Sequence, residues 1–278
     1  MSSTALSIDR PTAPHRPACL PVRFFGAGPD ADVHPSRDVF DMLKLLSDRL
    51  APRRLVVHAG DVIYEAGRRF DNLYVMNSGF FKLVTVSPDG REQVVGLKFR
   101  GDWLGFDGIA GGAYDCDAVA MDTGDVWVIG YEALLAACST EPALLTILHR
   151  AMSREIGRDR ESLLSMCTLP ADARVAEFLR YFADSLAKGG LRCDRITLRM
   201  TRAEIGNFLG MTFETVSRAL SRLERDKVIA FASKGRRDIE IADTGALAAF
   251  VQRCIAPASK VPASASPLPD ARPFPTLQ

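Results

Sequence analysis

The segment TFETVSRALSR, residues 212–222, carries side chains that could recognise a hydrogen-bonding partner. Glu214, Ser217 and Arg218 lie close together if the segment is helical, because residues three and four apart are neighbours on a helix. Arginine can donate two hydrogen bonds to guanine, glutamate accepts from the amino group of cytosine, and serine or threonine binds bases or phosphates. These residue types at this spacing indicate a surface that contacts the edges of DNA bases.

Two short helices must hold that surface. Thr201 and Glu204 have the spacing of a capping box, which predicts the start of a first helix. Gly210 suits a left-handed helix end, and Thr212 can cap a second helix that follows at once. Two short helices joined by a tight turn, the second with an exposed polar face, predict a helix-turn-helix whose second helix enters the major groove.

A hairpin is predicted directly after this pair, in the segment IAFASKGRRDIEIA at residues 229–242. It resembles a wing, and its basic side chains are placed to contact phosphates. The alternative for the whole region is an ordinary helical hairpin whose charged face is only solvated. The candidate DNA-contacting residues are Thr201, Arg202, Thr212, Glu214, Thr215, Ser217, Arg218, Arg222, Lys234, Arg236 and Arg237.

The 278 residues are 47% apolar and 25% charged, which is enough for one large or two ordinary globular domains. The net charge of +1 does not identify a partner, since a nucleic-acid surface can be local. No segment has the apolar length of a membrane span, and the N-terminus lacks the order of a signal peptide, so a cytoplasmic protein is expected. The six cysteines are scattered without CxxC spacing and are expected to be reduced thiols.

Amino-acid composition and the periodicity of apolar residues divide the chain into segments. Residues 1–35 and 254–278 are rich in Pro, Ala and Ser, which predicts a disordered leader and a disordered tail. Residues 36–138 are predicted to form an antiparallel barrel or jelly roll, because short alternating runs between turn residues extend from about Arg54 to Ile129. Within them, SPDGRE at residues 87–92 predicts a hairpin in which Asp-Gly supplies the positive φ angles.

Residues 139–169 have helical periodicity, with one stripe that steps by three or four residues. The stripe comprises Leu145, Leu148, Met152, Ile156, Asp159, Leu163 and Met166. One interpretation is a helix packed on its own domain, and the other is the seam of a homodimer. On a two-fold axis the two Asp159 carboxylates would face each other and oppose association, which predicts a switchable dimer centred on Ile156, Asp159 and Leu163.

Residues 170–253 hold the helix pair and the wing, so the predicted fold class is α+β. The motifs AGDVIYEAG, LYVMNSGFFKL, GDWLGFDGIAGG and MTRAEIGNFLGMTFETVSRALSR occur in this order. Together they resemble the CRP/FNR family of bacterial transcription factors, and most of all its FNR (anaerobic regulator) branch, over roughly residues 50–250. The resemblance implies a cyclic-nucleotide-binding-like barrel, a long dimerisation helix and a C-terminal winged helix.

The resemblance also implies roles for single residues. Glu214, Ser217 and Arg218 match the pattern E-x-x-S-R of FNR-like recognition helices, which implies a palindrome of the type TTGAT-N4-ATCAA. Asp159 falls where FNR-like proteins place the carboxylate that opposes dimerisation. Gly90, in the predicted hairpin with Arg91, falls where such proteins contact RNA polymerase.

The cluster ligands of the FNR branch are not matched. Cluster binding there uses several closely spaced N-terminal cysteines and one cysteine in the barrel. This sequence has Cys19 alone near the N-terminus, and Trp127 stands at the barrel position. A four-cysteine iron-sulfur cluster is therefore not expected.

The nucleotide ligands of the CRP branch are not matched either. In CRP-like pockets a glutamate holds the ribose and an arginine holds the phosphate, and these positions are here Phe106 and Cys116. The charges of Asp115 and Asp117 beside the cysteine would repel a phosphate. Binding of cAMP is therefore not expected.

Three possibilities remain for the sensed signal: haem, thiol chemistry, or no ligand. A haem would need a ligand such as histidine, for which the candidates are His15, His34, His58 and His149. A thiol sensor would need an exposed cysteine of low pKa, and the cysteines considered are Cys19, Cys116 and Cys167.

Two other classes of function compete with a DNA-binding regulator. An enzyme is not supported, because P-loop, dinucleotide-binding, nucleophile-elbow and metal-spaced motifs are all missing from the sequence. A ligand-binding regulatory subunit that does not act on DNA would have no use for the helix pair and the wing. The sequence therefore predicts a homodimeric transcriptional regulator that contacts double-stranded DNA and RNA polymerase, in response to an oxygen, redox or nitric-oxide-related signal.

Overall fold

The computed structural model describes residues 35–233 and 235–256. Nearly all of the predicted leader, nearly all of the predicted tail, and Lys234 of the wing lie outside these residues. The same holds for Cys19, His15 and His34. None of the described helices is both long and apolar enough to cross a membrane.

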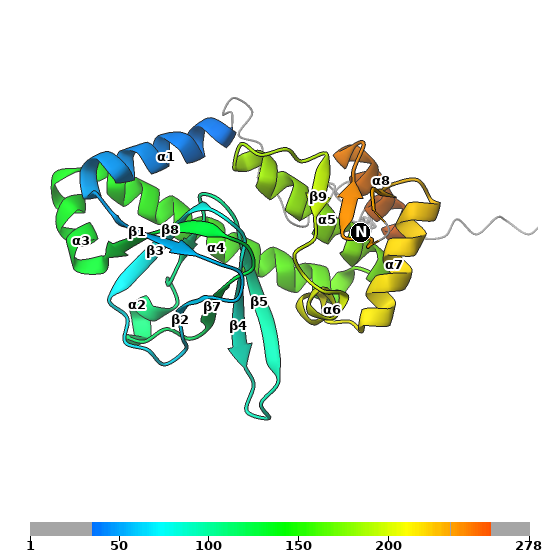
Figure 1. Cartoon of the computed structure of the whole chain (residues 1–278), viewed down its shortest axis with the longest axis horizontal. Helices are drawn as coiled ribbons and strands as arrows, with labels where there is room; N and C mark the ends of the chain where they lie inside the picture. Colours follow the sequence, from blue (N-terminus) through cyan, green and yellow to red (C-terminus); the bar gives the residue numbers. More distant parts are fainter. Residues whose placement is uncertain (1–34, 234, 257–278) are drawn as a thin grey trace, which may run out of the picture.

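A barrel of two antiparallel four-stranded sheets forms the first half of the chain (Figure 1). The first sheet has the order β1 (Arg53–Val57), β8 (Gly124–Gly130), β3 (Asn72–Ser78), β6 (Trp103–Leu104). The second has the order β2 (Val62–Tyr64), β7 (Asp117–Ala120), β4 (Phe81–Val86), β5 (Glu92–Lys98). The predicted barrel is thus confirmed, and β5 is an edge strand of its sheet.

Aromatic rings fill the interior of the barrel. The rings of Tyr64 and Tyr114 stack with centroids 4.0 Å apart, and Tyr74 stacks on Tyr64 at 5.3 Å. All three side chains are buried and belong to the core between the two sheets. Such rings bury large apolar areas, so the barrel is a packed core.

Helices cover the outer face of the first sheet. They are α1 (Pro35–Leu50), α3 (Tyr131–Thr140) and the N-terminal part of α4 (Pro142–Thr168), and a short α2 (Gly108–Gly111) lies in a barrel loop. Helix α1 was not predicted, although Val39, Met42 and Leu46 have helical spacing and are buried against the sheet. The barrel prediction for residues 36–138 therefore needs this helix added.

The hairpin between β4 and β5 is present, but its turn differs from the prediction. Only Gly90 has a positive φ, of 81°, while Asp89 does not share it. The Ser87 N–H donates to the Arg91 carbonyl (2.9 Å), and the Gly90 N–H donates to the Ser87 carbonyl (2.8 Å). A turn followed by a left-handed glycine closes a three-residue loop, which needs one positive φ rather than two.

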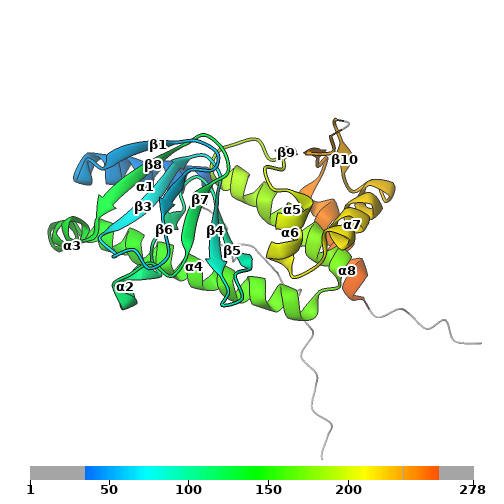
Figure 2. The ribbon, with the colours of Figure 1, turned by 60° about the horizontal axis from the view of Figure 1, so that its bottom comes forward.

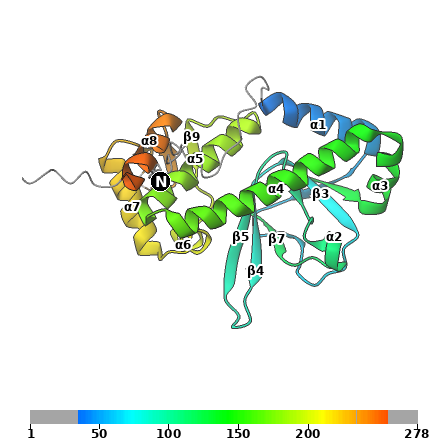
Figure 3. The same ribbon diagram turned by 180° about the vertical axis from the view of Figure 1, so that it is seen from behind.

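Helix α4 runs from the barrel to the second half of the chain (Figure 3). The second half contains α5 (Ala171–Lys188), β9 (Arg195–Thr197), α6 (Arg202–Leu209), α7 (Phe213–Arg225), β10 (Ala230–Phe231), β11 (Asp238–Glu240) and α8 (Thr244–Ile255). The three short strands form an antiparallel sheet in the order β10-β11-β9. A helix pair flanked by a small hairpin is the predicted winged helix-turn-helix.

The two halves share one hydrophobic core. Phe80 and Phe99 from the barrel side pack on Phe182 of α5, with centroids 5.1 and 4.9 Å from its ring. The β4–β5 hairpin extends toward α6, and β5 lies beside that helix (Figure 2). The barrel and the helix-turn-helix are therefore packed against each other.

Candidate nucleic-acid interface

The first helix of the pair begins with the predicted capping box. Thr201 Oγ1 accepts from the Glu204 N–H (3.1 Å), and Glu204 Oε2 accepts from the Thr201 N–H (2.8 Å). Gly210 ends the helix in the left-handed conformation, with φ 63°. These contacts satisfy backbone groups that a helix end leaves free. Thr201 thus serves the helix start.

A second glycine makes the turn possible. A Cβ on Gly206 would lie 2.5 Å from the carbonyl oxygen of Met211, too close for any side chain. The sequence pattern does not single out Gly206. A glycine is needed there because the backbone five residues later passes too close for a side chain. The turn between α6 and α7 is therefore fixed by two glycines.

Helix α7 turns an apolar face inward and a polar face outward. Val216, Leu220 and Leu223 are buried against the rest of the domain. Thr212 Oγ1 accepts from the Thr215 N–H (3.4 Å), and the two threonine hydroxyls are 3.1 Å apart, so both threonines belong to the start of the helix.

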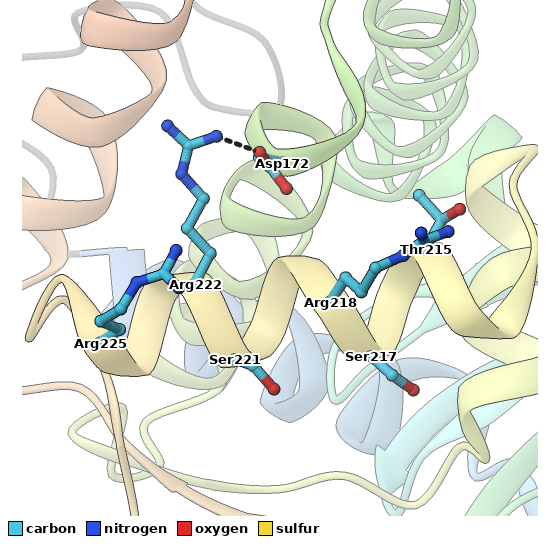
Figure 4. Close-up of a pocket in the computed structure, with 7 residues that line it drawn as sticks. All are labelled: Asp172, Thr215, Ser217, Arg218, Ser221, Arg222 and Arg225. Carbon is cyan, nitrogen blue, oxygen red and sulfur yellow. Dashed lines mark hydrogen bonds and ion pairs between the residues drawn. The ribbon is translucent and has the colours of Figure 1, made fainter.

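The outward face holds Glu214, Ser217 and Arg218, here called the reading face. All three side chains are exposed, and none has a hydrogen bond or ion pair with the described residues. Ser217 and Arg218 line an open groove along α7, and in Figure 4 they project from different sides of the helix ribbon. Groups exposed in this way are available to base edges without first breaking a protein contact.

Arg222, on the same helix, is engaged. It forms an ion pair with Asp172 of α5 (Figure 4), and its guanidinium lies 5.8 Å from the centre of the Phe250 ring in α8. These contacts hold α7 against the two neighbouring helices. Arg222 is therefore in place to support the reading face.

The wing is held by two further predicted arginines. Arg236 Nη2 donates to Glu224 Oε2 (2.8 Å) and Ser221 Oγ (3.2 Å) of α7, and its guanidinium lies 4.3 Å from the centre of the Phe231 ring. Arg202 Nη2 donates to the Arg236 carbonyl (2.6 Å). Both side chains bind protein groups in this structure.

Arg237, by contrast, is exposed, and its side chain has no partner among the described residues. Lys234 lies outside them. Of the predicted wing cations that the structure describes, Arg237 is thus the one available to a phosphate.

Helix α4 carries an exposed apolar stripe along its middle and C-terminal parts. Ile156 is 50% exposed and Leu163 is 62% exposed, whereas Leu148 is buried under the first sheet. Leu148 of the predicted stripe therefore packs on its own domain, whereas Leu145 before it is 38% exposed, and Ile156 and Leu163 after it are free of the domain. Packing on its own domain thus accounts for the buried part of the stripe, and a dimer seam stays a prediction for the exposed part.

Asp159 lies between these exposed apolar residues. Its pKa is raised, first by loss of solvent and second by the charge of Glu155, while Lys98 and Arg158 work in the opposite direction. A carboxylate here is costly to bring into an apolar contact. The structure thus places the predicted switch residue within the exposed stripe.

Gly90 and Arg91 lie in the β4–β5 turn, and both are exposed. The Arg91 guanidinium pairs with Asp89 within the same turn, at 2.5 Å. This local pair fixes the shape of the loop and leaves its outer surface exposed.

The residues at the expected nucleotide site do not fit a cyclic nucleotide. Phe106 stacks on Trp103, with ring centroids 5.9 Å apart. Asp107 Oδ2 accepts from the Asp115 N–H (2.8 Å) and lies 3.4 Å from Cys116 Sγ. Donors that a phosphate would need are therefore bound to a carboxylate, whose charge repels an anion.

The described cysteines offer limited redox chemistry. Burial, and then the Asp107 charge, raises the pKa of the Cys116 thiol to about 12, so almost none is thiolate at neutral pH. Cys138 is buried and its thiol pKa is raised by burial, whereas Cys167 is exposed on α4.

The described side chains also offer few ligands for a metal ion. Trp127, at the barrel position of the FNR cysteine, is buried between the first sheet and its covering helices. His58 Nδ1 lies 3.7 Å from Asp61 Oδ2, and His149 is exposed on α4. Within residues 35–233 and 235–256, no three His, Cys, Asp or Glu side chains are grouped as metal ligands would be.

Comparisons with known proteins agree with this architecture. Residues 173–250 match the Crp-like helix-turn-helix domain, and residues 54–141 match the cyclic nucleotide-binding domain. The fumarate and nitrate reduction regulatory protein of Salmonella typhimurium is 34% identical over 203 residues, which is 73% of this chain and 80% of that protein. Electron transport regulator A of Shewanella oneidensis is 33% identical over 187 residues, 67% of this chain and 75% of that protein.

A solved structure shares the fold. FixK2 from Bradyrhizobium japonicum superposes with a TM-score of 0.64 at 24% identity, over 75% of this chain and 99% of its own. A barrel, a long helix and a winged helix-turn-helix thus occur in the same order in both proteins. The chain has this fold, an exposed polar face on the second helix of the helix-turn-helix, and these relatives. It therefore belongs to the CRP/FNR family of DNA-binding transcription regulators, which are not enzymes.

Proposed function

We propose that this regulator binds a TTGAT-N4-ATCAA-like palindrome as a homodimer, through the reading face of each protomer. The observation that carries the proposal is that Glu214, Ser217 and Arg218 are exposed and unpaired within the described residues. Their side chains suit cytosine, guanine and neighbouring base edges. Arg237, with Lys234, would contact phosphates, while Thr201, Arg202, Thr212, Thr215, Arg222 and Arg236 would hold the helix pair and wing in place.

The second protomer would pack on the exposed stripe of α4. Ile156, Leu163 and Met166 are exposed apolar side chains on one long helix, and two copies related by a two-fold axis would cover them. A two-fold dimer accounts for a palindromic target because its recognition helices meet equivalent half-sites.

A gel-shift titration over a range of salt concentrations tests the target. The palindrome should be retarded at lower protein concentration than a scrambled duplex of the same length and composition, at every salt concentration. Equal retardation of both duplexes, in oxidised and reduced protein alike, would remove the proposed specificity.

The signal is proposed to be related to oxygen, redox state or nitric oxide, and the regulator to act in the cytoplasm on anaerobic gene expression. The names of the relatives, which refer to fumarate and nitrate reduction and to electron transport, support this class of signal. Exposed Cys167, with Cys19, is a candidate thiol, and haem is the other candidate. An absorption spectrum of protein purified without oxygen separates haem or an iron-sulfur cluster from a colourless thiol protein.

The β4–β5 turn at Gly90 and Arg91 is proposed to contact RNA polymerase. Its exposure and its position away from the reading face are compatible with a contact made while DNA is bound. Transcription in vitro with Gly90→Asp, compared with DNA binding by the same variant, tests it. Lost activation with unchanged DNA binding is expected.

Arg237→Ala is expected to make DNA binding less dependent on salt. Each phosphate contact contributes roughly 0.9 to the slope of log K against log salt, so a dimer losing two contacts should lose about 1.8. The slope is measured by fluorescence anisotropy between low and physiological salt. Arg53→Ala, which removes an exposed arginine of β1, is the charge-matched control and should leave the slope unchanged; an unchanged slope in Arg237→Ala would exclude the phosphate contact.

Asp159→Ala is expected to tighten the dimer by roughly 3- to 10-fold, because paired carboxylates no longer oppose association. Association of the wild type should also strengthen as pH falls, since the facing carboxylates would raise the pKa of Asp159 in the dimer above its already raised value in the protomer, so that association takes up protons. Asp159→Asn should lose that pH dependence. Sedimentation velocity at several pH values measures both effects, with Glu132→Gln as an exposed-acid control. A dimer fraction equal to or below that of the wild type would remove Asp159 from the switch.

A further inference from the structure

Strand β5 contacts helix α4 at one end through ion pairs and helix α6 at the other end through hydrogen bonds. At its C-terminal end, Lys98 is only 2% exposed and forms an ion pair with Glu155 of α4. Just beyond the strand, Asp102 pairs with Arg158 of the same helix at 2.5 Å. These contacts fix the end of β5 to the helix that carries the proposed dimer seam.

The N-terminal end of β5 is bonded to the helix-turn-helix through Asn207 of α6. The Val94 N–H donates to Asn207 Oδ1 (2.6 Å), and Asn207 Nδ2 donates to the Glu92 carbonyl (2.6 Å). Because β5 is an edge strand, these backbone groups face away from β4. The carboxamide therefore makes the pair of hydrogen bonds that a neighbouring strand would make.

Two more directed contacts join the same surfaces. Gln93 Nε2 donates to the Asn207 carbonyl (2.6 Å), and Lys82 Nζ of β4 lies 2.6 Å from Glu204 Oε1 of α6. Glu204 is the capping-box residue, so the ion pair holds the first turn of α6. Burial raises the pKa of Glu204, but its bonds to Lys82 and Thr201 together lower it by more, so the net shift is downward.

Directed contacts fix an orientation that apolar packing alone does not. The aromatic contact between the barrel and α5 is favourable over a range of rotations, because the hydrophobic effect is non-directional. Hydrogen bonds weaken steeply as their angle changes. The bonds of Asn207 and Glu204 therefore fix the rotation of α6, and with it that of α7, relative to α4.

We infer that Asn207 is a positioning residue that sets the spacing between the two DNA half-sites. This rests on the proposed homodimer and palindrome. Each added spacer base pair moves a half-site by roughly 3.4 Å and rotates it by roughly 34°. A dimer can select one spacer only if each recognition helix is held at a fixed position relative to the two-fold axis, and β5 provides the connection from α4 to α6.

The test measures binding to duplexes that differ only in the spacer, TTGAT-Nn-ATCAA with n from 3 to 6, and to a duplex with one half-site. The wild type should prefer n = 4 by roughly tenfold or more, because only that spacer lets both heads bind together. Asn207→Ala should bind n = 4 roughly tenfold more weakly and bind all four spacers within roughly threefold of one another. Binding to the single half-site should not change.

Lys82→Gln provides a second variant outside the helix-turn-helix, and it leaves the capping box of α6 intact. It should flatten the spacer preference in the same direction. Glu92→Gln is the matched control, since only the backbone carbonyl of Glu92 takes part, and it should keep the wild-type profile.

An unchanged spacer profile in both Asn207→Ala and Lys82→Gln would overturn the inference, whether overall affinity rises or falls. An equal loss on the single half-site would also overturn it, because the damage would then lie in base contact itself. If the wild type shows no preference among the spacers, the proposed palindrome fails instead, and this is seen before any variant is measured.

Discussion

Replacing Arg158 with methionine is expected to lower the free energy of unfolding by about 3 to 5 kcal/mol, since it leaves a buried carboxylate without its cation. Arg158 of α4 pairs with Asp102, which also accepts the Phe99 N–H at 3.0 Å. Burial raises the pKa of Asp102, but Arg158, Lys98 and the Phe99 N–H together leave that pKa below its ordinary value. Urea unfolding followed by circular dichroism, at one protein concentration near pH 7, measures the loss.

The contribution of Asp102 to stability depends on pH. The folded pKa of Asp102 is lowered, so its stabilising contribution is present above its ordinary value near 3.8 and is lost as pH falls through the folded pKa. The difference between the wild type and Arg158→Met should therefore shrink below roughly pH 4. Arg160→Met, on an exposed position of the same helix, is the control and should change stability by less than about 0.5 kcal/mol. A loss no larger than that of the control would show that the pair is not a stabilising contact.

Arg218→Ala is expected to weaken binding to the palindrome by about 1 to 3 kcal/mol for each half-site, and to relax discrimination at one base pair. Because Arg218 has no partner among the described residues, its loss should not affect folding. Fluorescence anisotropy with the cognate duplex, and with each base pair of the half-site substituted in turn, measures both effects.

Arg218→Lys separates base contact from simple charge. Lysine keeps the positive charge but lacks the forked donors that bind guanine at two atoms. It should recover part of the affinity and little of the discrimination. If Arg218→Ala weakens all duplexes equally, Arg218 contacts a phosphate and the base contact must be assigned elsewhere on the reading face.

The helix-turn-helix was predictable because its determinants are local. The capping box of Thr201 and Glu204, the left-handed Gly210 and the cap at Thr212 each act within one turn of helix. The hairpin at residues 87–92 was predictable for the same reason, although the loop needs a positive φ only at Gly90. Asp159 on the exposed stripe followed from helical periodicity and the family resemblance.

The parts that could not be predicted depend on partners far along the chain. Arg222 and Arg218 belong to one helix and one residue type, yet Arg222 is bound to Asp172, 50 residues away, and Arg218 is free within the described residues. Helix α1 was missed because no family motif falls on it.

By itself, the sequence determined the helix pair, the two hairpins and which face of α7 is polar, because caps, glycines and periodicity act over a few residues. The tertiary structure alone decided which side chains on those elements are free. It buried Leu148 while leaving Ile156 exposed, and joined Asn207 to β5 across 113 residues. Contacts between distant segments depend on how the elements pack, and a local sequence pattern does not indicate which distant residues will be in contact.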